Sequence, residues 1–144
     1  MIEQLLAQWQ RCGVRLNAGA SEGDLQWLER YVGAALPEDV RRFYSLADGM
    51  PDTEVDEHLV SFWSIAKIRQ EVSGHAWPGH QTPIADVLIN SWFICLEVLQ
   101  GGRVSIGLEV QALEFASFTS FFERYVSDPS SLGFVAESGR RTSG

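Results

Sequence analysis

Residues 20–50 read ASEGDLQWLERYVGAALPEDVRRFYSLADGM, and this stretch decides the fold. It predicts two short helices. Ser21 is followed three residues later by Asp24, a spacing typical of a capping box at a helix start. Apolar side chains then recur at helical spacing at Leu25, Leu28 and Val32. Gly33 is expected to end this helix, because glycine readily adopts the left-handed conformation common at helix ends.

The second helix of this stretch is expected to start at Leu36-Pro37, because proline is tolerated in the first turn of a helix. A wide apolar face follows, formed by Val40, Phe43, Tyr44 and Leu46. Asp48-Gly49 should end this helix, again through a left-handed glycine. Neither helix carries a catalytic pattern, so the stretch predicts part of a core.

Length, composition and charge indicate one globular domain with an acidic surface. The chain has 144 residues, 45% hydrophobic and 21% charged. Its net charge of −8 disfavours nucleic-acid binding, because a negative field repels phosphate. The charge is explained either by solubility alone or by a basic protein partner attracted by charge complementarity.

The two cysteines, Cys12 and Cys95, are far apart and form no C-x-x-C pattern, which argues against a disulfide scaffold or a zinc site. Two thiols fit a reducing compartment. The first 13 residues include Glu3 and lack the basic start of a secretory signal. No apolar run approaches the ~18 residues of a membrane span. We therefore expect a cytoplasmic protein without membrane contact.

The rest of the chain predicts further helices and a sheet. A helix is expected over residues 2–11, a strand over 59–63, a helix after Ser64, the centre of a sheet over 83–98 with a turn at Asn90-Ser91, a hairpin turn over 100–103, strands over 104–108 and 113–115, and a last helix from Ser117 to Asp128-Pro129. This order indicates an α+β fold, a mainly antiparallel sheet with helices packed to one side.

We expect a single domain in three parts. Residues 1–17 form an N-terminal helix and link that belong to it, residues 18–133 form its body, and residues 134–144 are a loose tail.

The acidic loop, residues 48–58, contains five carboxylates and no Lys or Arg. The five are Asp48, Asp52, Glu54, Asp56 and Glu57. Such side chains cannot pack together away from water, because like charges repel and desolvation is costly. The loop is therefore either solvated or in contact with a cationic partner.

Candidate chemistry is sparse. His75 and His80 are separated by Trp77-Pro78-Gly79, which rules out a helix between them, and no Cys or acid completes a metal-ligand set. His58 follows Asp56-Glu57, and a carboxylate can orient a histidine base, yet no nucleophile signature accompanies it. Gly101-Gly102 lacks the Lys-Ser/Thr of a phosphate loop. We expect no enzyme activity, no metal and no cofactor.

Most of the five tryptophans should be core residues, because large rings supply much apolar burial. Trp77 lies in a Pro/Gly loop, where a ring either packs locally or anchors a partner. The candidate partner-binding residues are Asp52, Glu54, Asp56, Glu57 and Trp77.

Several short motifs resemble the SUKH superfamily, the domain of the fungal Smi/Knr cell-wall regulators and of many bacterial immunity proteins. In chain order they are Ser21-Glu22, Leu28-Glu29, Gly33, Leu36-Pro37-x-Asp39, Phe43-Tyr44, Asp48-Gly49, Phe62-Trp63-Ser64-Ile65, Ile84-Ala85-Asp86, Trp92-Phe93-Ile94 and Ser117-Phe118-x-x-Phe121-Phe122. The match spans residues 18–126. It departs at Asn90-Ser91, where glycine-rich members have a tighter turn.

This resemblance implies an α+β domain without a catalytic centre, built to bind. Its bacterial branch implies an immunity protein that neutralises a cognate toxin, often a basic nuclease or another toxin domain. The alternative is a regulatory scaffold of the cell-wall-regulator type, and the short chain favours the immunity branch. The acidic loop matches no family pattern, so its binding role rests on its residues alone.

Overall fold

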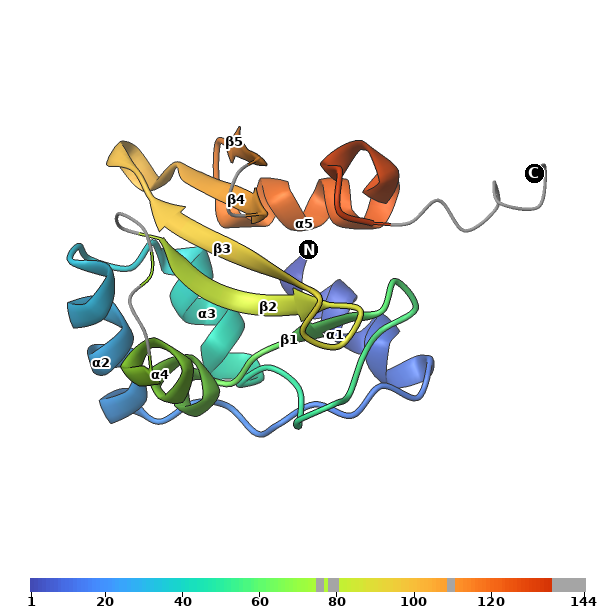
Figure 1. The fold of residues 1–144 in the computed structure, drawn as a ribbon, viewed down its shortest axis with the longest axis horizontal. Coiled ribbons are helices and arrows are strands. Elements are labelled where there is room, and N and C mark those ends of the chain that lie inside the picture. Colours follow the sequence, from blue (N-terminus) through green and yellow to red (C-terminus); the bar gives the residue numbers. More distant parts are fainter. Residues whose placement is uncertain (75–76, 78–80, 109–110, 136–144) are drawn as a thin grey trace.

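The computed structural model describes residues 1–74, 77, 81–108 and 111–135. These residues form an α+β domain with an antiparallel sheet, which confirms the predicted class (Figure 1). Its elements are α1 (Ile2–Arg11), α2 (Glu22–Val32), α3 (Glu38–Leu46), β1 (Val60–Phe62), α4 (Ile65–Gly74), β2 (Thr82–Val87), β3 (Trp92–Val98), the 3-10 turn η1 (Gln100–Gly102), β4 (Val104–Leu108), β5 (Gln111–Phe115), α5 (Phe118–Ser127) and the 3-10 turn η2 (Pro129–Leu132). No helix in the described ranges is long and apolar enough to cross a membrane.

The helix ends follow the sequence closely. The Ser21 hydroxyl accepts the N–H of Asp24 at 3.1 Å and caps α2. Gly33 ends α2 in the left-handed conformation, with φ 81°. Ser117 caps α5 by accepting the N–H of Ser120 at 3.0 Å. Pro37 lies one residue before α3 and not within its first turn.

Gly49 has the predicted left-handed conformation, but the prediction that it ends α3 is wrong. Helix α3 ends at Leu46, and Ala47 after it is extended. Gly49 has φ 67°, but it lies against the end of β1, where a Cβ atom would come within 2.5 Å of the Trp63 carbonyl group. Glycine is needed here for close backbone approach as well as for the positive φ.

Asp48 and Gly49 belong to a junction that joins three segments. The Asp48 carboxylate accepts the N–H of Ile65 at 2.8 Å and so caps α4. Asn17 N donates to Gly49 O at 2.9 Å, and Met50 N donates to Phe62 O at 2.7 Å. The loop after α3 is thereby tied to the link after α1 and to the outer edge of β1.

The sheet has the order β1-β2-β3-β4-β5, and each strand pairs antiparallel with the next. A bulge interrupts the β2–β3 register between Pro83 and Ala85. Gly101 and Gly102, both with positive φ, form the predicted turn between β3 and β4. Residues 88–91 form the turn between β2 and β3, as the Asn90-Ser91 pair predicts.

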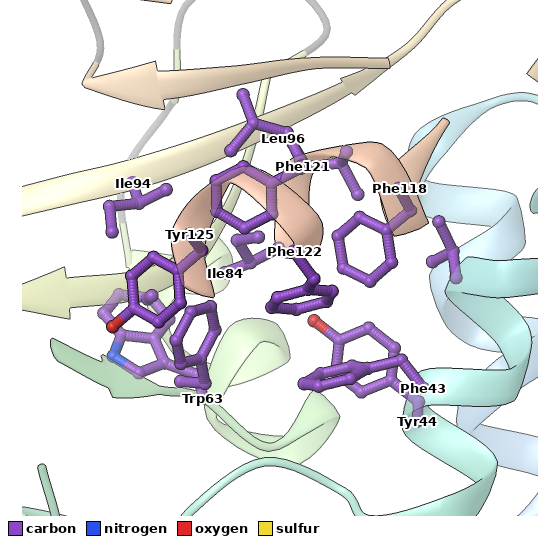
Figure 2. Close-up of a cluster of buried hydrophobic side chains, with 14 of the residues drawn as sticks. Phe43, Tyr44, Trp63, Ile84, Ile94, Leu96, Phe118, Phe121, Phe122 and Tyr125 are labelled. Atoms are coloured by element: carbon purple, nitrogen blue, oxygen red, sulfur yellow. The ribbon is translucent and has the colours of Figure 1, made fainter. Parts of the chain in front are cut away.

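An aromatic cluster joins α5 to the sheet and to α3. Figure 2 shows Phe121, Phe122 and Tyr125 of α5 beside Ile94 and Leu96 of β3. The Phe122 ring lies 5.1 Å from that of Phe43 and 5.8 Å from that of Phe62. Helices α1, α3 and α5 lie on the far side of β2 and β3 in Figure 1, as predicted. Large rings packed at such distances supply much of the apolar burial of a core.

The opposite face of the sheet is also partly covered. Phe93 neighbours Ile94 in β3, and successive strand residues point to opposite faces. The Phe93 ring contacts that of Trp63, which lies two residues before the start of α4, and the Lys67 ammonium group of α4 lies over the Trp63 ring. The start of α4 therefore packs on the face of the sheet opposite α1, α3 and α5, whereas all helices were expected on one side.

The packed chain extends past the predicted boundary at residue 133. Phe134 and Val135 are buried against the core, so they belong to the domain and not to a loose tail. The remainder of the predicted tail, residues 136–144, lies outside the described residues.

We expect Gly49→Ala to destabilise the domain far more than Gly33→Ala. Both glycines have positive φ, so alanine costs about 1–2 kcal/mol at either position. Only at Gly49 does the added methyl group meet backbone atoms, and overpacking adds about 1–3 kcal/mol. Urea unfolding of both variants measures the difference. Equal losses would contradict the close approach described here.

Candidate partner-binding surface

Glu54 of the acidic loop is already paired within the chain. Its carboxylate accepts the backbone N–H of Arg15 at 2.7 Å and two guanidinium N–H groups of Arg15 at 3.2 and 3.1 Å. The backbone hydrogen bond and then the side-chain bonds from Arg15 lower the pKa of Glu54. Glu54 thus binds the loop to the segment after α1. The sequence predicted only a partner-binding role for this carboxylate.

The expectation that all acids of this loop meet solvent or a partner is wrong for Asp56. Asp56 is only 4% exposed. Its Oδ1 accepts the N–H groups of His58 at 2.9 Å and Val60 at 3.2 Å, and its Oδ2 accepts the Tyr125 hydroxyl of α5. These donors offset the cost of desolvation. Burial raises the pKa of Asp56 and, with the nearby carboxylate, that of Tyr125. Asp56 is a structural residue that a partner cannot reach.

Asp52 and Glu57 are the exposed acids at the tip of the loop. Their side chains are 79% and 66% exposed. Asp52 lies 3.2 Å from the Lys67 ammonium group, while Glu57 lies 3.6 Å from Nε2 of His58. Asp48, which caps α4, is half-buried, and this burial raises its pKa. The loop therefore offers a partner two carboxylates and not five.

Trp77 packs locally, the first of the two alternatives that its sequence position left open. It is half-buried, and its ring lies 5.4 Å from that of Phe93 at an angle of 86°. The predicted histidine pair, His75 and His80, lies outside the described residues. Within the described ranges, no group of three His, Cys, Asp or Glu side chains could hold a metal ion.

The four most exposed of the large apolar side chains in the described residues gather at the β2–β3 turn. We call this group the apolar turn surface, and it consists of Leu59, Leu88, Ile89 and Trp92. Ile89 is 65% exposed and Trp92 57% exposed. Leu59 joins them because its carbonyl accepts the N–H of Leu88 at 3.0 Å, so the turn lies beside the segment that enters β1 (Figure 1).

The backbone of this turn is strained. Leu88, Ile89 and Asn90 have φ values of 55°, 50° and 63°, and Leu59 has 61°. This left-handed region costs an L-residue roughly 1–2 kcal/mol, and a β-branched residue such as isoleucine is rarely found there. Three such residues in succession require strong local support.

Hydrogen bonds from the turn supply that support. Asn90 N donates to Oδ1 of Asp86 at 3.1 Å, Ser91 N to Val87 O at 3.2 Å, and the Ser91 hydroxyl to Leu88 O at 2.9 Å. Asp86 is only 3% exposed. The turn is thereby fixed to β2 by a buried carboxylate.

Asp86 also connects the turn to the core. Its Oδ2 accepts the indole N–H of Trp63 at 2.6 Å and lies 4.0 Å from the Lys67 ammonium group. Because Lys67 also faces Asp52, one chain of polar contacts runs from the acidic loop through α4 to the β2–β3 turn. Side chains from the acidic loop, α4 and β2 therefore support the apolar turn surface.

A hollow of about 350 Å³ lies beside the apolar turn surface. It is lined by Val87, Leu88, Trp92, Leu108, Gly133, Phe134 and Val135. All but Gly133 have apolar side chains, so the hollow favours an apolar group of a ligand.

These observations define a small α+β domain whose antiparallel sheet carries an exposed, strained apolar turn. The model of the SMI1 / KNR4 family (SUKH-1) matches residues 19–124, so the chain belongs to this family and the predicted resemblance is confirmed. None of the curated proteins compared matches the chain.

Sequence reasoning placed the β2–β3 turn but missed its exposed side chains. Leu88 and Ile89 are expected at the centre of the sheet, since residues 83–98 are rich in branched and aromatic residues, whereas the sequence leaves the burial of Trp92 open. The signal available was the Asn90-Ser91 pair, which places the apolar residues on either side of it at the tip of a hairpin.

We expect Tyr125→Phe to lower the free energy of unfolding by about 1–3 kcal/mol, because it leaves the buried Asp56 carboxylate without one of its donors. Tyr31→Phe, which alters a partly exposed tyrosine on α2, should change stability by less than about 0.5 kcal/mol. Denaturant unfolding compares the two. Unchanged stability of Tyr125→Phe would show that the hydroxyl does not hold Asp56.

Proposed function

We propose that this chain is an immunity protein, a non-catalytic binding domain that neutralises a cognate bacterial toxin by covering part of its surface. Membership of the SMI1 / KNR4 family (SUKH-1) supports the general class. The observation that carries the proposal is the apolar turn surface, where strained backbone presents exposed Leu88, Ile89 and Trp92.

The strain favours a binding role over an accident of packing. Backbone conformations of this kind persist only where the surrounding structure enforces them, and they concentrate at functional sites. Contiguous exposed apolar side chains mark sites of interaction with other molecules. A turn that is costly to form and exposes apolar groups to water brings no benefit to an isolated domain.

The charge supports a basic toxin, for example a nuclease. The chain carries a net charge of −8, and neither residues 43–66 nor residues 70–102 contain a Lys or Arg. A basic partner would be attracted by this field, whereas a nucleic acid would be repelled. Cys12 and Cys95 are both thiols not joined in a disulfide, which suits a reducing compartment, so we place the activity in the cytoplasm.

The proposal predicts rescue of poisoned cells. The C-terminal domain of the protein encoded beside this gene is expressed with and without this chain, and surviving colonies are counted. We expect that domain to kill and this chain to restore growth. Killing that persists with this chain present at the same level, or a harmless domain, would contradict the proposal and favour a regulatory scaffold of the cell-wall-regulator type.

A further inference from the structure

We infer that the apolar turn surface is the part of this chain that enters the toxin, and that it occupies an apolar cleft rimmed by Lys or Arg side chains. This inference rests on the proposed function and adds to it the contact residues and the chemistry of the partner's surface.

The acidic residues beside the turn favour a partner whose cleft is rimmed by Lys or Arg side chains. Glu57, whose side chain is 66% exposed, lies two residues before Leu59, and its carboxylate lies 3.6 Å from Nε2 of His58. Asp52 and Glu54, in contrast, already face Lys67 and Arg15. No Lys or Arg occurs within residues 43–66 or 70–102, which include the turn and its neighbouring loop. Rim charges of the opposite sign on the partner would speed association and fix its orientation.

The turn is prepared for an apolar contact before the partner arrives. Its backbone is held by bonds to Asp86, Val87 and Leu59, so little further ordering is needed on binding. A site fixed in its bound conformation loses less entropy on association. Trp92 and Leu88 also line the open hollow beside the turn, where an apolar side chain of the partner would pack against them.

The same net charge argues against two other occupants. An anionic membrane surface would repel a chain with a charge of −8. A second copy would bring two acidic surfaces together, and juxtaposed like charges oppose association. A basic protein is the occupant that satisfies both the apolar side chains and the acidic surroundings.

The decisive variant is Ile89→Asn, because it separates binding from folding. Asparagine tolerates the left-handed backbone better than isoleucine does, and position 89 is 65% exposed, so the unfolding midpoint should stay the same or rise. Its affinity for the toxin domain, measured by calorimetry, should fall at least about tenfold, as for truncation of an interface anchor.

Leu46→Asn is the matched control, since Leu46 is also an exposed apolar residue, 43% exposed, but lies on α3. It should bind normally. Glu57→Gln should slow association at low salt and leave dissociation nearly unchanged. Tight binding by Ile89→Asn and Trp92→Ala would overturn the inference while leaving the proposed function intact, because the wild-type chain would still rescue cells.

Two further outcomes would overturn the inference in favour of another occupant. One is a wild-type dimer in sedimentation that Ile89→Asn converts to a monomer. The other is wild-type binding to phosphatidylglycerol vesicles that Ile89→Asn abolishes. Failure of the wild-type chain to rescue cells would instead reject the proposed function itself, so the two failures are distinguishable.

Discussion

The buried carboxylate of Asp86 is the contact on which the candidate site depends. One oxygen accepts the indole N–H of Trp63, and the other accepts the N–H of Asn90 in the β2–β3 turn. A carboxylate that is only 3% exposed is costly unless donors and a nearby cation compensate it. Trp63, Asn90 and the more distant Lys67 provide that compensation. Asp86 therefore holds both the Trp63 indole in the core and the backbone of the β2–β3 turn.

The β2–β3 turn places residues that disfavour its backbone conformation at positions where they are also exposed to water. Folding alone favours Gly or Asn at left-handed positions, yet this chain has Leu88 and Ile89 there, side by side and exposed. The Gly49 junction shows the opposite solution, because the chain uses glycine where the backbone is left-handed and crowded. The contrast indicates that the side chains at residues 88 and 89 are not explained by the backbone conformation of the turn. A protein contact is the explanation we propose.

Local features of the fold could be predicted from the sequence, and long-range features could not. The caps at Ser21 and Ser117 act within three residues, so their patterns are readable along the chain. The need for glycine at residue 49 arises from the backbone of Trp63, and the burial of Asp56 depends on Tyr125, 69 residues away. The same limit affected the candidate site. The acidic loop was found, but whether each carboxylate was free depended on partners that only the fold brings close.

Hydrogen–deuterium exchange of this chain, alone and with the proposed toxin partner, tests the central claim most directly. If the strained turn is the contact, amide exchange should slow on binding within residues 86–92 and around Leu59. The account also predicts little change in α3, none of whose residues belongs to the apolar turn surface or lines the hollow beside it. Slowed exchange confined to the groove lined by α1, residues 16–18 and residues 46–47, with none at the turn, would contradict it.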